Sequence, residues 1–150
     1  MNVISILNAL LADELTAIHQ YIVHAEMVAN WGYPALNVAV MKRAKTEMKH
    51  ASMLLSRILF LAGVPVVNRL NAIHVGQDVP MQFQMDRQAE IGAVQNYTAA
   101  LQMIASDEVT CTLLRSIVND ENGHLAWLET QLALIAQLGV SAYLSPWTRA

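Results

Sequence analysis

The chain of 150 residues has little of what marks many specialised proteins. Cys111 is its single cysteine, which excludes an internal disulfide and suits a reducing compartment. Charged residues make up 14%, with 9 basic against 12 acidic, so no basic surplus favours nucleic acid. No apolar run reaches the roughly 18 residues of a membrane span, and the first residues lack a secretory signal. We therefore expect a cytoplasmic protein that binds neither nucleic acid nor membrane.

Hydrophobic residues are abundant, at 55% of the chain. This content is ample for one buried core, and we expect a single domain over residues 1–150. So few charges leave little polar surface for a monomer, which favours the burial of further apolar surface between subunits. The composition therefore predicts an oligomer.

Apolar residues recur at helical spacing in four long segments, which predicts an all-α protein. The segment 62–77 is long for a turn between antiparallel helices, so we interpret it as a crossover along a four-helix bundle. One long crossover is typical of ferritin-like bundles, and a short helix is expected near the C-terminus. The expected helices run from about Val3 to Trp31, where Gly32 ends the first; from Ala35 to Leu61; from the cap Asp78 to Ala105; and from Glu108 to Leu138.

Two Glu-x-x-His tetrads stand out within these helices. On a helix a glutamate and a histidine three residues apart project from nearly the same side, so each tetrad offers a carboxylate and an imidazole to one point. Two lone glutamates lie at similar depth in the other two helices. This is the ligand set expected of a di-iron carboxylate bundle. The tetrads are Glu47 to His50 and Glu121 to His124, and the lone residues are Glu14 and Glu90.

Four carboxylates in a core would repel one another, and burial would raise their pKa values. Two divalent cations would balance the four charges. A set of oxygen and nitrogen ligands without thiolate favours iron or manganese, although zinc would also bind. The alternative, a solvated pair on a helix surface, is the ordinary interpretation of one tetrad, but two tetrads and two lone glutamates at matched depth disfavour it.

Several stretches resemble the bacterioferritins, the haem-containing ferritins of bacteria, over nearly the whole chain. The resemblance implies that Glu14, Glu47, His50, Glu90, Glu121 and His124 are the di-iron ferroxidase ligands, with the two tetrad glutamates bridging the metals. The stretches are Asp13-Glu14-Leu15, Asn30-Trp31-Gly32, Glu47-Met48-Lys49-His50-Ala51, Arg57-Ile58-Leu59-Phe60-Leu61, and Gly123-His124 with Trp127-Leu128-Glu129-Thr130.

The resemblance also implies an activity and partners. Ferrous iron would be oxidised by dioxygen or peroxide and stored as a ferric mineral inside a shell of twenty-four subunits built from dimers, which serves iron storage and detoxification. A ferredoxin-type reductant would release the iron. Haem b would lie at the dimer interface with Met48 from each of two subunits as its axial ligands, whereas the alternative for Met48 is an ordinary interface methionine. Tyr21, seven residues after Glu14, would lie beside the site, or it is simply a core tyrosine.

Some residues depart from the family. Lys42 and Thr46 stand where many bacterioferritins carry a histidine and an aspartate, so an inner-surface iron site is not expected and storage would be modest. A mixed shell with a second ferritin subunit, or a haem-bearing structural subunit of such a shell, stays open. So does a non-cage peroxidase of the rubrerythrin type or a manganese catalase. His24 follows no ligand spacing, and we expect it at the surface or an interface.

Overall fold

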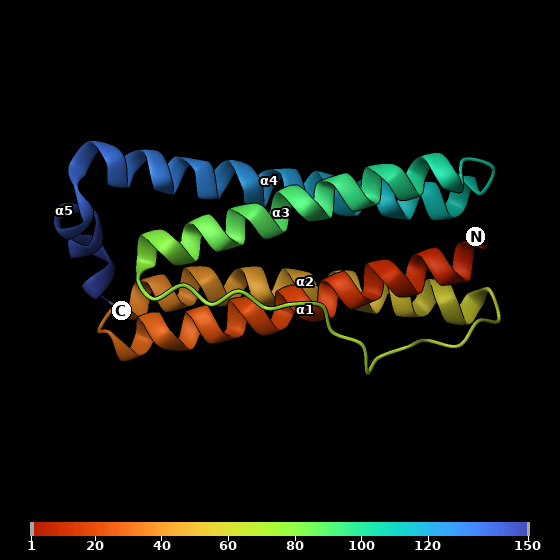
Figure 1. Ribbon diagram of the computed structural model, residues 1–150, viewed down its shortest axis with the longest axis horizontal. Coiled ribbons are helices and arrows are strands. Elements are labelled where there is room, and N and C mark those ends of the chain that lie inside the picture. Colours follow the sequence, from red (N-terminus) through yellow and green to blue (C-terminus); the bar gives the residue numbers. More distant parts are fainter. Residues whose placement is uncertain (1, 150) are drawn as a thin grey trace.

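Four long α-helices make up most of the chain in the computed structural model, which describes residues 2–149. They are α1 (Val3–Asn30), α2 (Pro34–Phe60), α3 (Val79–Met103) and α4 (Glu108–Leu138). They lie along one axis, with α1 paired to α2 and α3 paired to α4 (Figure 1). A short helix, α5 (Val140–Leu144), lies at one end of the bundle. The predicted all-α bundle with a short C-terminal helix is confirmed.

Side-chain caps and a glycine fix where these helices begin and end. Asp78 accepts a hydrogen bond from the Met81 amide at 2.8 Å, so it caps α3 as predicted. Asp107 caps α4 in the same way, with the Thr110 amide as donor at 3.1 Å. After α1, Gly32 has a φ of +95°, a left-handed conformation that favours glycine. The first helix therefore ends at the place that the sequence predicts.

The segment between α2 and α3 runs along the bundle to its other end, so α2 and α3 point the same way (Figure 1). Side chains of α1 hold it. The Asn8 side chain donates to the Val64 carbonyl at 3.0 Å and accepts from the Val66 amide at 2.8 Å. Further along, the Thr16 hydroxyl accepts from the Asn71 amide at 2.8 Å. The predicted crossover is confirmed, and side chains of α1 form hydrogen bonds with some of its backbone amides and carbonyls.

The apolar core consists of two clusters, and a layer of buried charged and polar side chains separates them along the bundle. Within residues 2–149, no helix is both long enough and apolar enough to cross a membrane. The polar layer lies midway along the four long helices. One cluster includes Leu7, Leu11, Leu54, Ile58, Leu114 and Ile117, and the other includes Tyr21, Ala25, Leu36, Val40, Phe83 and Leu128.

Candidate metal centre

Six side chains from the four long helices meet in the polar layer. Each is at most 4% exposed, so none is a solvated surface residue. They form two groups of four, and in each group one ligand atom per residue lies within 4.8 Å of all the others. The structure thus brings together the whole predicted ligand set. The first ligand group is Glu14, Glu47, His50 and Glu121, and the second ligand group is Glu47, Glu90, Glu121 and His124.

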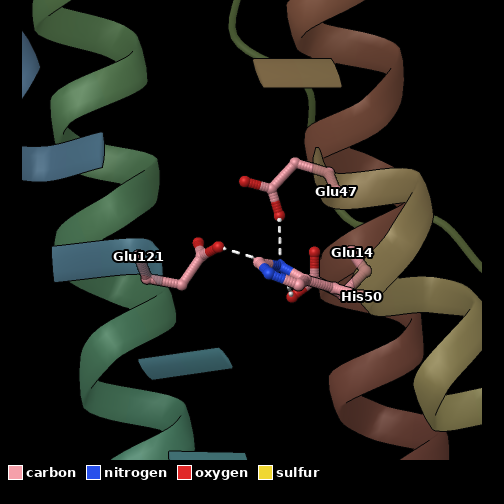
Figure 2. A group of neighbouring side chains, drawn as sticks. All are labelled: Glu14, Glu47, His50 and Glu121. Carbon is pink, nitrogen blue, oxygen red and sulfur yellow. Dashed lines mark hydrogen bonds and ion pairs between the residues drawn. The ribbon is translucent and has the colours of Figure 1, made fainter. Parts of the chain in front are cut away.

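In the first ligand group, three carboxylates surround one imidazole nitrogen (Figure 2). His50 Nδ1 lies 3.0 Å from Glu121 Oε1 and 3.2 Å from Glu47 Oε2. Glu14 Oε1 is slightly further away, at 3.6 Å. These atoms come from α1, α2 and α4, and they converge because each glutamate lies near the middle of its helix.

The second ligand group repeats this pattern around His124. Its Nδ1 atom lies 3.1 Å from Glu47 Oε1, 3.4 Å from Glu90 Oε1 and 3.8 Å from Glu121 Oε1. Glu47 therefore directs one oxygen to each imidazole, and Glu121 Oε1 lies near both. Two carboxylates shared between two ligand groups can bridge a pair of cations.

Two tyrosines support the carboxylates that are not shared. The Tyr21 hydroxyl donates to Glu90 Oε1 at 2.5 Å, and the Tyr97 hydroxyl donates to Glu14 Oε1 at 2.5 Å. Tyr21 thus contacts the cluster through Glu90 on α3 and not through Glu14 on its own helix. Sequence reasoning missed Tyr97, although it follows Glu90 by seven residues as Tyr21 follows Glu14.

The charge of this cluster fits cations. Burial and the neighbouring Glu14 carboxylate raise the pKa of Glu47 well above its ordinary value. Burial and Glu90 raise the pKa of Glu121 to about 11. Burial also acts on Glu90, but hydrogen bonds from Glu121 and His124 outweigh it and hold the pKa of Glu90 below its ordinary value. Without cations the cluster therefore shares protons among its carboxylates.

Within residues 2–149, three carboxylate oxygens of the cluster are buried and make no hydrogen bond, although one of them, Glu121 Oε1, lies 3.0 Å from His50 Nδ1. An unpartnered buried oxygen is costly. Two divalent cations would use these oxygens as ligands, together with the imidazole nitrogens. The donor set therefore fits the metal pair that the sequence predicts. The oxygens are Glu14 Oε2, Glu90 Oε2 and Glu121 Oε1.

A cavity of about 480 Å³ leads to this cluster between α1, α3 and the crossover. The buried carboxylates of Glu14, Glu90 and Glu121 line its inner part. At its exposed side, the Asp13 carboxylate accepts hydrogen bonds from Asn71 at 2.6 Å and from Asn96 at 2.9 Å. A small cation could reach the carboxylates through this cavity without unfolding of the bundle.

His24 lies next to the centre in a buried network, so its expected position at the surface or an interface was wrong. Its Nε2 atom accepts from the Gly76 amide at 3.0 Å, and Nδ1 lies 2.9 Å from Asp86 Oδ1. The Gln20 side chain donates to the same Asp86 oxygen at 2.9 Å. A Cβ on Gly76 would lie 2.3 Å from the Gln82 backbone nitrogen, so only glycine fits there. These contacts fix the crossover against α1 and α3 beside the cluster.

Met48 lies on the outside of α2, one residue after the fully buried Glu47. It is 41% exposed, so its side chain is accessible from outside the subunit. Lys42 is also exposed, and the Thr46 hydroxyl donates to the Lys42 carbonyl at 3.2 Å within the same helix.

Cys111 is buried in the first apolar cluster, where its thiol donates a hydrogen bond to the Ile104 carbonyl at 3.4 Å.

The bundle and its two ligand groups define a class of protein that comparisons with known sequences identify. The family model described as Ferritin-like domain matches residues 4–138. A bacterioferritin of Mycobacterium leprae is 38% identical over 144 residues, which cover 95% of this chain and 91% of the relative. A bacterioferritin of Streptomyces coelicolor is 39% identical over 145 residues, which cover 95% and 87%. A bacterioferritin of Mycobacterium tuberculosis is 36% identical over 144 residues, which cover 95% and 91%.

These matches extend over nearly the whole of both chains, so they concern the entire bundle and not a single motif. The chain belongs to the bacterioferritin family of ferritin-like proteins.

Proposed function

We propose that this protein stores iron and that its two ligand groups form a ferroxidase centre, where ferrous iron is oxidised. The observation that carries the proposal is the sharing of Glu47 and Glu121 between two four-ligand groups. This arrangement provides places for two ferrous ions in one buried pocket and four carboxylates to balance their charge. Family membership supports the same activity.

In this proposal Fe(II) is the substrate and the side chains position it. Glu14 and His50 hold one ion, Glu90 and His124 hold the other, and Glu47 with Glu121 bridges them. Each ferrous ion gives up one electron, and dioxygen or peroxide accepts the pair. The hydroxyls of Tyr21 and Tyr97 keep the two terminal carboxylates oriented, as hydrogen-bonded outer residues do at metal sites.

Oxygen uptake after addition of Fe(II) to the metal-free protein tests the centre. We expect a fast phase that saturates at two iron ions per subunit. Glu121→Ala should abolish it, because both ligand groups lose a shared ligand. Glu129→Ala, an exposed glutamate on the same helix, is the matched control and should leave the phase intact. A wild-type protein without a saturable phase, or a Glu121→Ala variant that keeps it, would refute the proposal.

We further propose that Met48 binds haem b together with the partner subunit's Met48. The exposed Met48 side chain on the outside of α2 supports this, because a group at a twofold axis needs only one methionine from each subunit. When bound, haem supplies a one-electron redox group at the interface. A haem-supplied protein should show haem absorption bands that vanish in Met48→Ala and persist in Met103→Ala, a control at another exposed methionine. Bands that survive Met48→Ala would contradict this.

The storage part of the proposal is a shell of twenty-four subunits, alone or mixed with a second ferritin subunit, to which a ferredoxin-type reductant brings electrons for iron release. Lys42 and Thr46 offer neither a carboxylate nor an imidazole at their positions, so we propose modest mineral storage. The mass of the assembly and its iron content per shell test this. A dimer that evolves oxygen from peroxide when loaded with manganese would favour the manganese catalase alternative instead.

A further inference from the structure

The two imidazoles of the centre differ in what their outer nitrogens contact. His50 Nε2 lies 2.8 Å from Asp120 Oδ2, on α4. For His124, no hydrogen-bond partner of Nε2 occurs among residues 2–149, and its contacts are all made by Nδ1. The inner contacts of the two rings are otherwise alike. The difference therefore lies outside the ligand groups themselves.

The sequence explains this difference. Asp120 directly precedes the glutamate of the tetrad on α4, and it reaches the histidine of the tetrad on α2. The equivalent residue on α2, directly before Glu47, is Thr46. Threonine has no carboxylate, so the position equivalent to Asp120 offers none. The Thr46 hydroxyl donates to a carbonyl of its own helix.

A carboxylate that accepts the outer N–H of an imidazole has two effects on a metal ligand. It fixes the tautomer, so that the inner nitrogen carries the lone pair, and it makes that nitrogen a stronger donor. For His50 both effects direct Nδ1 toward the first ligand group. Asp120 is 42% exposed at its side chain, so its own carboxylate does not need this contact to satisfy a buried charge.

We propose that Asp120 is a positioning residue that makes the first ligand group the tighter of the two, so that divalent cations fill it before the second ligand group. The inference rests on the proposed ferroxidase centre, because it assigns an order to the same two metal positions. It concerns metal affinity and not the oxidation step. Outer carboxylates of this kind typically change metal affinity by about 10- to 100-fold.

Anaerobic titration of the metal-free protein with Co(II), followed by its visible absorption, separates the two events. We expect two ions per wild-type subunit, bound in two steps. Asp120→Ala and the isosteric Asp120→Asn should weaken the first step by about 10- to 100-fold and leave the second unchanged. Thr46→Asp should instead strengthen the second step, since it restores a carboxylate at the equivalent position. Glu129→Gln, at another half-exposed acidic residue of α4, should change neither step.

Circular dichroism and the mass of the assembly show whether each variant is folded, and neither Asp120 nor Thr46 belongs to the buried core. Two equal steps in the wild type, or equal weakening of both steps in Asp120→Ala, would overturn the inference while the metal centre stands. A wild-type protein that binds no Co(II) would overturn the ferroxidase centre as well. The two failures are thus distinguishable.

Discussion

The first and second ligand groups are two versions of one design. Each has its own glutamate with a tyrosine hydroxyl bound to it, its own histidine, and a share in Glu47 and Glu121. Within residues 2–149, the hydrogen bond between His50 and Asp120 has no counterpart at His124. Two similar metal positions thus arise from the repeated tetrads on α2 and α4. A difference in their metal affinity can come from a single residue beside a tetrad.

The largest contrast is expected from the two glutamates that are not shared. Glu90→Gln leaves the first ligand group intact, so one Co(II) ion should still bind with the affinity of the first step. Glu14→Gln leaves only the second ligand group, so one ion should bind about 10- to 100-fold more weakly. Both variants should lose the fast oxidation of Fe(II), because it needs the pair of ions.

Isothermal titration calorimetry and oxygen uptake measure these outcomes, with Glu26→Gln at an exposed position of α1 as the control. Equal affinities in the Glu14→Gln and Glu90→Gln proteins would show that the two ligand groups are equivalent. Loss of both ions in either variant would show that they do not bind independently at all.

Local spacing accounts for what the sequence could predict of this site. A glutamate and a histidine three residues apart share a side of a helix whatever lies around them, so the two tetrads are visible without a structure. Depth along the helices then adds Glu14 and Glu90. The exposed position of Met48 also follows, because it is adjacent to the buried Glu47 on the same helix.

Contacts between distant segments account for what the sequence did not reveal. Tyr21 and Tyr97 each bind the glutamate of the other helix. The helices α1 and α3 run antiparallel (Figure 1), so the residues that follow each glutamate continue in opposite directions along the bundle. His24 is buried only because Asp86 and Gly76, more than fifty positions away, bind its two nitrogens. Such partners depend on helix order and on the path of the crossover.

A smaller and equal effect is expected from the two tyrosines. Tyr97→Phe removes the donor to Glu14 and Tyr21→Phe removes the donor to Glu90, both at 2.5 Å. Hydrogen bonds to charged groups contribute about 1.5–3 kcal/mol. A bound cation would interact with the carboxylate oxygen that has lost its hydroxyl donor, and this would offset part of the loss. We expect each variant to weaken only its own step of the Co(II) titration, by about tenfold or less.

Thermal unfolding of the metal-free variants provides the control, since both tyrosines are buried and lose the same hydroxyl. The two proteins should lose similar amounts of stability. A Tyr97→Phe variant that weakens the second step, or both steps, would argue against the assignment of Glu14 to the first ligand group alone.

The smallest effect is expected at Gly92, which lines the cavity that reaches Glu14, Glu90 and Glu121. A Cβ built on Gly92 meets no atom within 4 Å, so there is space for the first atom of a side chain at the cavity wall. Gly92→Leu should slow Co(II) binding to both ligand groups by the same few-fold factor and leave both affinities unchanged, because it obstructs a shared path and touches no ligand.

Stopped-flow absorption measures these rates, and Gly92→Ala is the control. Alanine should leave the rates unchanged while it stabilises α3 by about 0.5–1 kcal/mol, because glycine lowers helix stability. If Gly92→Leu slows only one step, the two ligand groups are reached by separate paths, and their filling order would then reflect access as well as the bond between His50 and Asp120. Equal slowing of both steps leaves that bond as the structural difference that sets the order.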